Sequence, residues 1–221
     1  MVYYYVIPKW FFSLDIGLKI LFASITFLVS FFSYKVYKIS EHREAKLFSL
    51  SFLLISLSYF SWSLLNFLIL PSYKTAEEIT RLIIERNTYL LLLGVFTHMA
   101  LFLSGLITIV YTQFKIKNGK VYYMMLGLAL LVLASSFNKV MTFHILSAFL
   151  LTFIIYNYIE EYSKRNNKKT LFVLIAFIFL FLSSIDFIFS LSYYQAYVIG
   201  HLFELIAYIL ILLSLISSIR K

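Results

Sequence analysis

Long apolar runs separated by short polar loops make up almost the whole of this chain. Each run is close to the roughly 20 residues that a helix needs to cross a hydrocarbon core about 30 Å thick. The runs are too long for barrel strands, and they lack period-two alternation. The pattern therefore predicts an all-α integral membrane protein, a seven-transmembrane-helix bundle formed as one domain over residues 1–221. The expected spans are approximately 14–36, 47–70, 89–112, 121–137, 140–159, 171–192 and 195–218.

The loops between these runs alternate in charge. Lys and Arg gather in the cytoplasmic loops of membrane proteins. Thirteen of them fall on one side of the predicted membrane and five on the other, while Lys19 lies within a span. We therefore expect the N-terminus outside, the C-terminus in the cytoplasm, and a multi-pass protein of the cell membrane. The basic side receives Lys35, Lys38, Arg43, Lys46, Lys115, Lys117, Lys120, Lys164, Arg165, Lys168, Lys169, Arg220 and Lys221.

Composition agrees with this class. Hydrophobic residues make up 62% of the chain and charged residues 13%, against roughly 45–50% and about 25% in soluble domains. The lipid bilayer is thus the expected surrounding. The net charge of +9 is explained by loop residues that face anionic head groups, so no nucleic-acid partner is expected. The chain has no cysteine, which excludes disulfides and thiolate ligands.

The longest outer loop carries a helix signal of its own. Thr75-Ala76-Glu77-Glu78 has the form of a capping box, with Thr at the cap and Glu three residues later. Ile79, Leu82 and Ile83 follow at helical spacing. We expect a short amphipathic helix over about 76–86 on the outer surface, either a connector or a lid over a pocket.

Seven ionisable residues lie within the predicted spans, where they are costly and by default indicate a functional site. With the orientation above, all of them fall in the outer half of the membrane or near its midplane. They are Asp15, Lys19, His98, His144, Asp186, His201 and Glu204.

Polar positions also share helix faces. In the last span, Tyr197, His201, Glu204 and Tyr208 are spaced four, three and four residues apart, which places them on one stripe. Such stripes cannot face lipid without leaving charges in hydrocarbon, so we expect them to converge on an outward-facing pocket. The residues expected to line ligand space there are Asp15, Lys19, Trp62, Asn66, Tyr197 and Tyr208.

The pocket chemistry leaves several interpretations open. His, Asp and Glu without Cys form a ligand set suited to Zn or Fe. The predicted ligands of one transition metal are His98, His144, Asp186, His201 and Glu204. The alternatives are a hydrogen-bonded network without a ligand, a pocket for a polar organic molecule, and a proton or ion path. Haem is disfavoured because nothing beyond two histidines at similar depth points to it, and retinal because the last span has no lysine.

Three functions are compatible with this picture. The favoured one is a sensor or receptor-like module that signals through a membrane or cytoplasmic partner protein. The second is a metal-dependent membrane hydrolase acting on a lipid or an outer substrate. Its inventory is similar to that of seven-helix ceramidases, but those place two histidines four residues apart on the last helix, and position 205 here is Leu. The third is a small transporter or an accessory subunit, which an opening on the inner side would favour.

Overall fold

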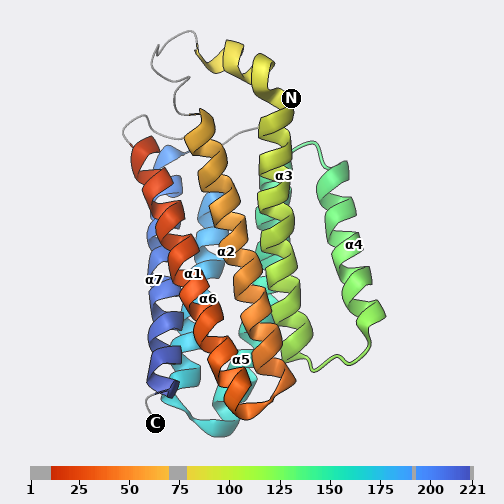
Figure 1. Cartoon of the computed structure of the whole chain (residues 1–221), viewed down its shortest axis with the longest axis vertical. Coiled ribbons are helices and arrows are strands. Elements are labelled where there is room, and N and C mark those ends of the chain that lie inside the picture. The colour runs from red at the N-terminus through yellow and green to blue at the C-terminus, as the bar shows by residue number, and fades with distance from the viewer. Residues whose placement is uncertain (1–10, 70–78, 191–192, 220–221) are drawn as a thin grey trace.

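The described part of the chain is entirely helical. The computed structural model describes residues 11–69, 79–190 and 193–219, and over these ranges it contains seven helices and no strand. Figure 1 shows them as a bundle of roughly antiparallel rods. Their bounds are α1 Phe12–Ser40, α2 Arg43–Ile69, α3 Ile79–Gln113, α4 Gly119–Ser135, α5 Lys139–Arg165, α6 Lys168–Phe189 and α7 Tyr194–Ile219.

Six of these helices are long and apolar enough to cross a bilayer, which supports a multi-pass membrane protein. The exception is α4, whose 17 residues extend only about 25 Å at 1.5 Å per residue. The sequence predicted seven spans and marked the fourth as short. The structure confirms an all-helical bundle of seven helices and distinguishes α4 from the other six by length.

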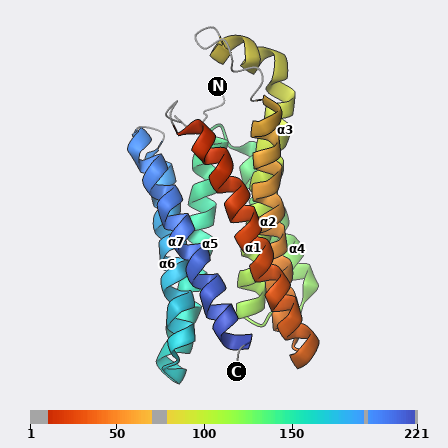
Figure 2. The ribbon, with the colours of Figure 1, turned by 60° about the vertical axis from the view of Figure 1, so that its left-hand side comes forward.

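The six long helices form a closed ring. Going around it, α1 packs against α2, α2 against α3, α3 against α5, α5 against α6, α6 against α7, and α7 against α1 again. The two views in Figures 1 and 2 show α4 outside this ring, beside α3. Only Leu133 of α4 is buried. The axis of the six-helix ring is therefore where a site shared by several helices can form.

Asparagine side chains begin three of the helices. Asn118, Asn138 and Asn167 precede α4, α5 and α6, and each accepts a hydrogen bond from a backbone N–H of the first turn at 3.0 to 3.1 Å. Such caps satisfy backbone donors that have no partner within the helix. The short turns at 118, 138 and 167 are consequently fixed by local chemistry.

Small residues bring α1, α2 and α3 close together. Ser30 and Ser49 exchange hydrogen bonds, each hydroxyl donating to the other residue's carbonyl at 2.8 Å. A Cβ atom built on Gly105 would lie 2.8 Å from the carbonyl oxygen of Ser51. Small residues allow this close approach between membrane helices.

The N-terminal turns of α3 bend from the rest of the helix and run across the top of the bundle, as Figures 1 and 2 show. Residues 79–86 of the amphipathic helix expected over 76–86 are helical and continuous with α3. The capping box Thr75–Glu78 lies outside the described residues. The first described residue after it is Ile79, at which α3 begins. The surface role of this segment stays a prediction.

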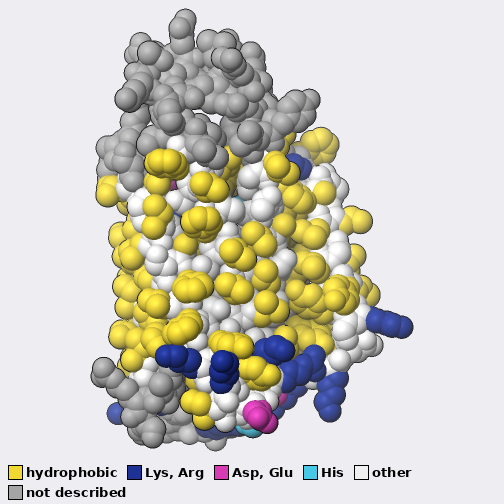
Figure 3. All heavy atoms as spheres, in the orientation of Figure 1, with side chains coloured by type: hydrophobic (Ala, Val, Ile, Leu, Met, Phe, Trp, Pro, Cys, Tyr) yellow, Lys and Arg dark blue, Asp and Glu magenta, His cyan; other side chains and the backbone are white. Residues whose placement is uncertain are grey.

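One end of the bundle is basic. The α1–α2, α3–α4 and α5–α6 turns lie together there and carry eleven of the thirteen Lys and Arg residues assigned to the cytoplasmic side. Figure 3 shows a flank covered by apolar side chains and a row of Lys and Arg near this end. We call it the basic end, and the opposite one the outer end. An apolar flank bounded in this way fits contact with a lipid bilayer.

Candidate functional site: a buried polar network between α1, α2 and α7

Two parallel helices, α1 and α7, present faces with the same spacing. Six positions on each helix repeat at intervals of four, three, four, three and four residues, and all are buried except the partly buried Leu215, so each set follows one face of its helix. Matched in order from the outer end, the two faces form a seam of six layers. The layers are Asp15 with Tyr197, Lys19 with His201, Phe22 with Glu204, Thr26 with Tyr208, Val29 with Ile211, and Ser33 with Leu215.

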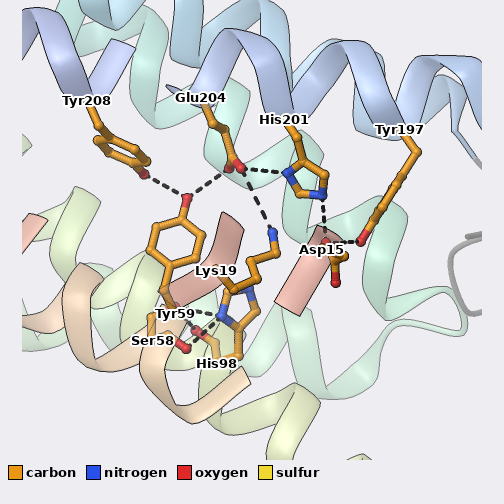
Figure 4. A network of polar contacts seen from close by, with 9 residues as sticks. All are labelled: Asp15, Lys19, Ser58, Tyr59, His98, Tyr197, His201, Glu204 and Tyr208. Atoms are coloured by element: carbon orange, nitrogen blue, oxygen red, sulfur yellow. Dashed lines mark hydrogen bonds and ion pairs between the residues drawn. The ribbon is translucent and has the colours of Figure 1, made fainter. Parts of the chain in front are cut away.

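The outer layers of this seam hold a continuous chain of polar contacts (Figure 4). Tyr197 donates its hydroxyl to Asp15 Oδ1 at 2.9 Å, and the same oxygen lies 3.0 Å from His201 Nε2. His201 Nδ1 is 3.0 Å from Glu204 Oε2. Tyr59 of α2 donates to Glu204 Oε1 at 2.8 Å and contacts the hydroxyl of Tyr208 at 2.7 Å. We call these six residues the relay.

The two ring nitrogens of His201 face two different carboxylates. Carboxylate oxygens only accept hydrogen bonds, so the 3.0 Å hydrogen bond between His201 Nδ1 and Glu204 Oε2 needs a proton on the nitrogen. On the other side of the ring, Nε2 lies 3.0 Å from Asp15 Oδ1 and makes no hydrogen bond within the described residues. The ammonium of Lys19 lies 3.9 Å from Glu204 Oε2, which adds positive charge beside the two carboxylates.

Burial raises the energetic cost of any unbalanced charge among these residues. Asp15 and His201 are fully buried, and Lys19 and Glu204 are 6% and 7% exposed. The Lys19 ammonium also lies 5.3 Å from the ring centre of Tyr59, a distance typical of a cation–π contact. An uncompensated charge in such surroundings costs several kcal/mol.

All six ring helices line a small cavity beside the relay. Its volume is about 20 Å³, which is room for about one water molecule. The cavity is too small for an organic ligand in this conformation, since such pockets usually measure about 300–1,000 Å³. Its lining residues are Lys19, Tyr59, Trp62, His98, Phe102, Phe143, His144, Ser184, Phe187, Tyr197 and Glu204.

Two predicted histidines reach this cavity from the far side of the ring. His98 Nδ1 lies 3.0 Å from the backbone oxygen of Ser58. The same nitrogen lies 2.7 Å from the hydroxyl oxygen of Ser58. His144 packs against Phe187, with ring centres 4.9 Å apart. Both histidines line the cavity.

The remaining predicted residues divide between the cavity and its surroundings. Trp62 lines the cavity and lies 5.1 Å from the His98 ring, centre to centre. Asn66 is buried one turn further toward the outer end of α2. Asp186 of α6 is only partly buried and is not among the residues that line the cavity. Asn66 and Asp186 therefore lie outside the relay and the cavity. The predicted residues that the structure brings together there are Asp15, Lys19, Trp62, His98, His144, Tyr197, His201, Glu204 and Tyr208.

The geometry of this cluster is one of pairwise contacts. Within the described ranges, no group of three or more His, Asp or Glu side chains is arranged to hold a metal ion. Both ring nitrogens of His201 face carboxylates, and a metal ligand would need one of them free. The metal set predicted from the sequence is split accordingly between the relay, the cavity wall and α6.

Sequence reasoning did not identify Tyr59, although it bonds two relay members. Trp62 and Asn66 of the same helix, four residues apart on one face, were predicted to line the pocket. At 100° per residue, Tyr59 lies at the edge of that face, about 20° from Asn66. A tyrosine among 18 carries little signal by itself, and only its position on this face distinguishes it.

A second and much larger opening lies at the basic end. This basin has a volume of about 1040 Å³ and is enclosed by the ends of α1, α2, α3, α5 and α7. Exposed residues of the α1–α2 turn and of the end of α5 form its rim, where Lys164 pairs with Glu160 and Arg165 with Glu161. Ser33, Gln113 and Tyr158 lie deeper. The basin is thus polar and opens to the basic side.

Comparison with protein-family models, with curated proteins and with solved structures finds no match to this chain. Function must therefore be argued from the geometry of the relay, the cavity and the basin.

Proposed function

We propose that the protein is a sensor module of receptor-like architecture, in which a change in the protonation of the relay is the signal and a partner protein reads the result. The observation that carries the proposal is the chain from Tyr197 to Tyr208. Six buried groups on three helices are joined by contacts of 2.7 to 3.0 Å. Chains of this kind inside a membrane indicate proton relays.

The size of the cavity limits the kind of signal. A space of about 20 Å³ admits water, and a proton needs no space beyond the hydrogen bonds that carry it. The titratable groups that line it come from five helices: Lys19 of α1, Tyr59 of α2, His98 of α3, His144 of α5, and Tyr197 and Glu204 of α7. A proton that enters this set alters the charge of the α1–α7 seam directly.

The seam offers a route from signal to output. Its two helices continue to the basic end, where α1 and α7 border the basin. Separation or rotation of α1 against α7 would change the shape of that basin. A partner that contacts the basic end would then distinguish the two states, as population-shift models of signalling require.

Spin labels test this proposal, because a chain without cysteine accepts them at chosen positions. We would replace Ile39 of α1 and Leu213 of α7 by cysteine, since both side chains are exposed, at 84% and 56%. The distance between the two labels is then measured by pulsed electron paramagnetic resonance in nanodiscs, from about pH 7.5 to about pH 5, the range in which histidine ordinarily titrates.

The expected result is a shift of the distance distribution on acidification. Glu204→Gln, which removes one negative charge, should show the shifted distribution already at neutral pH. Asp186→Asn is the matched control, because it removes a carboxylate outside the relay and should keep the wild-type response. A distance distribution that does not change with pH would reject the proposal. So would a Glu204→Gln variant whose distribution changes with pH as that of the wild type does.

Transport is a second candidate, and the basin favours it. An opening of about 1040 Å³ on the basic side, with a charged cluster deeper in the same ring, fits an inward-open carrier. In such a carrier the proton is either the transported ion or the ion whose movement drives the transport of another solute. Measurement of proton flux separates this candidate from a pure sensor.

A further inference from the structure

The relay and the basin lie on the same seam, and one apolar layer separates them. Thr26 and Tyr208 end the polar part of the seam, and Ser33 and Leu215 border the basin. From Thr26 to Ser33 the helix advances by seven residues, or about 10 Å. Val29 and Ile211 occupy the layer between them.

Four apolar residues of α2, α3 and α5, between the positions that line the cavity and those that line the basin, belong to the same packed cluster as Val29 and Ile211. Buried hydroxyls in the same stretches, such as those of Ser51, Ser56 and Thr108, donate to backbone carbonyls. The four apolar residues, Val29 and Ile211 are each at most 2% exposed. We call the six residues the plug: Val29, Ile55, Leu106, Leu151, Ile154 and Ile211.

On its basin side the plug meets a buried hydroxyl. Ser33 is 2% exposed, and its Oγ has no hydrogen-bond partner among the described residues. Buried polar atoms normally have one, so an unpartnered hydroxyl at the wall of a polar basin points to contact with water there. Polar groups therefore face the plug from both sides.

We propose that the protein conducts protons between the relay and the basic-end basin, with the plug as a hydrophobic gate that is closed in this conformation. The proposal rests on the proposed function, because it uses the same relay. Apolar constrictions block ions by excluding water and conduct when they become wet. The relay supplies the hydrogen-bonded part of the path, and the basin supplies its water-filled part.

The proton balance of such a path is simple. Each relay member accepts one proton from its neighbour on one side and releases one to the neighbour on the other, so no group changes its net protonation. The sequence runs from Tyr197 and Asp15 through His201 and Glu204 to Tyr59 and Tyr208, and then through water in the opened plug to the basin. No other reactant is required.

The choice of proton over other cations follows from space. The cavity holds about one water molecule at 20 Å³, which leaves no room for a hydrated metal ion. A proton relayed through hydrogen bonds needs no such room.

Val29→Thr tests the gate with minimal change of shape. Threonine has nearly the volume of valine, and its hydroxyl would stand between Thr26 and Ser33 at helical spacing. The full-length chain is reconstituted in liposomes that contain a pH-sensitive dye, with the membrane potential clamped by potassium and valinomycin. We expect proton flux roughly tenfold faster than in wild type, as for a barrier about 1.4 kcal/mol lower.

Three further variants make the outcome decisive. Ile211→Ser opens the same layer from α7 and should increase the flux similarly. Adding Glu204→Gln to Val29→Thr should return the flux to the wild-type rate, because the relay is broken. Val140→Thr is the matched control, the same change at a buried position, 3% exposed, near the outer end of α5, and should leave the flux at the wild-type rate.

Two results would overturn the conduction path. One is equal flux in Val29→Thr, Ile211→Ser and Val140→Thr. The other is fast flux that persists when Glu204→Gln is added, because the route would then bypass the relay. The spin-label distances separate this failure from failure of the sensor: a pH response without gated flux would leave the sensor standing and remove the path.

Discussion

At the residue scale, the site depends on groups that hold two partners each. The Tyr59 hydroxyl donates to Glu204 and contacts Tyr208 at 2.7 Å, and it is the only described bridge from α2 into the relay. Tyr59→Phe keeps the ring and its packing but leaves a buried carboxylate oxygen without that donor. We expect the free energy of unfolding in detergent to fall by about 1–3 kcal/mol.

Tyr123→Phe provides the control for this measurement. Tyr123 of α4 is 72% exposed, so loss of its hydroxyl should leave the unfolding midpoint where it is in the wild type. If Tyr59→Phe also unfolds at the wild-type midpoint, the contact with Glu204 contributes nothing measurable to the bundle.

Metal binding can be decided at the same scale. We expect purified protein to carry no stoichiometric transition metal, since the Lys19 ammonium shares the cavity with His98 and His144. The His201 nitrogens are also occupied by Asp15 and Glu204. Elemental analysis of detergent-purified protein measures this. One ion per chain, lost in both His98→Gln and His144→Gln, would contradict the expectation and make the hydrolase the leading function.

At the element scale, the seam between α1 and α7 explains what the sequence could reveal. The α7 stripe was recognisable because all four of its outer members are polar and stand at helical spacing. Its counterpart on α1 has the same spacing, but Phe22 and Val29 interrupt the polar positions, so only Asp15 and Lys19 stood out. Recognition of the seam requires knowing that α1 and α7 are neighbours and parallel, and spacing within one helix does not contain that information.

The position of Asp186 shows what depth and helix faces leave open. Asp186 was predicted in the outer half of the membrane, like His201, but the sequence does not give the direction in which a face of α6 points within the bundle. Facing direction then decided the outcome, because α6 turns Phe187 and Ser184 toward the cavity and leaves Asp186 partly exposed. The basin was not predicted at all, since it is formed by five helix ends far apart in the chain.

At the scale of the whole molecule, the seven-helix topology depends on the shortest helix. At about 25 Å, α4 is shorter than a hydrocarbon core of roughly 30 Å, and a short span is accommodated by bilayer thinning or by flanking residues that reach the interface. Lys120 begins the helix at the basic end. Lys139 follows it at the outer end and donates to the backbone oxygens of Ala134 and Ser136 at 3.1 and 3.3 Å. Lysines at both ends are suited to this role.

Cysteine labelling tests whether α4 crosses. The chain has no cysteine, so Lys117→Cys and Lys139→Cys each present one thiol, before and after α4. With a membrane-impermeant maleimide added to intact cells, we expect Lys139→Cys to react and Lys117→Cys to react only after the cells are opened. Lys168→Cys, in the α5–α6 turn, should behave like Lys117→Cys because the basic end lies on one side. If Lys117→Cys and Lys139→Cys are equally protected in intact cells, α4 does not cross the membrane. In that case α5, α6 and α7 would each cross in the direction opposite to that in the structure, and the proton path depends on the direction seen there.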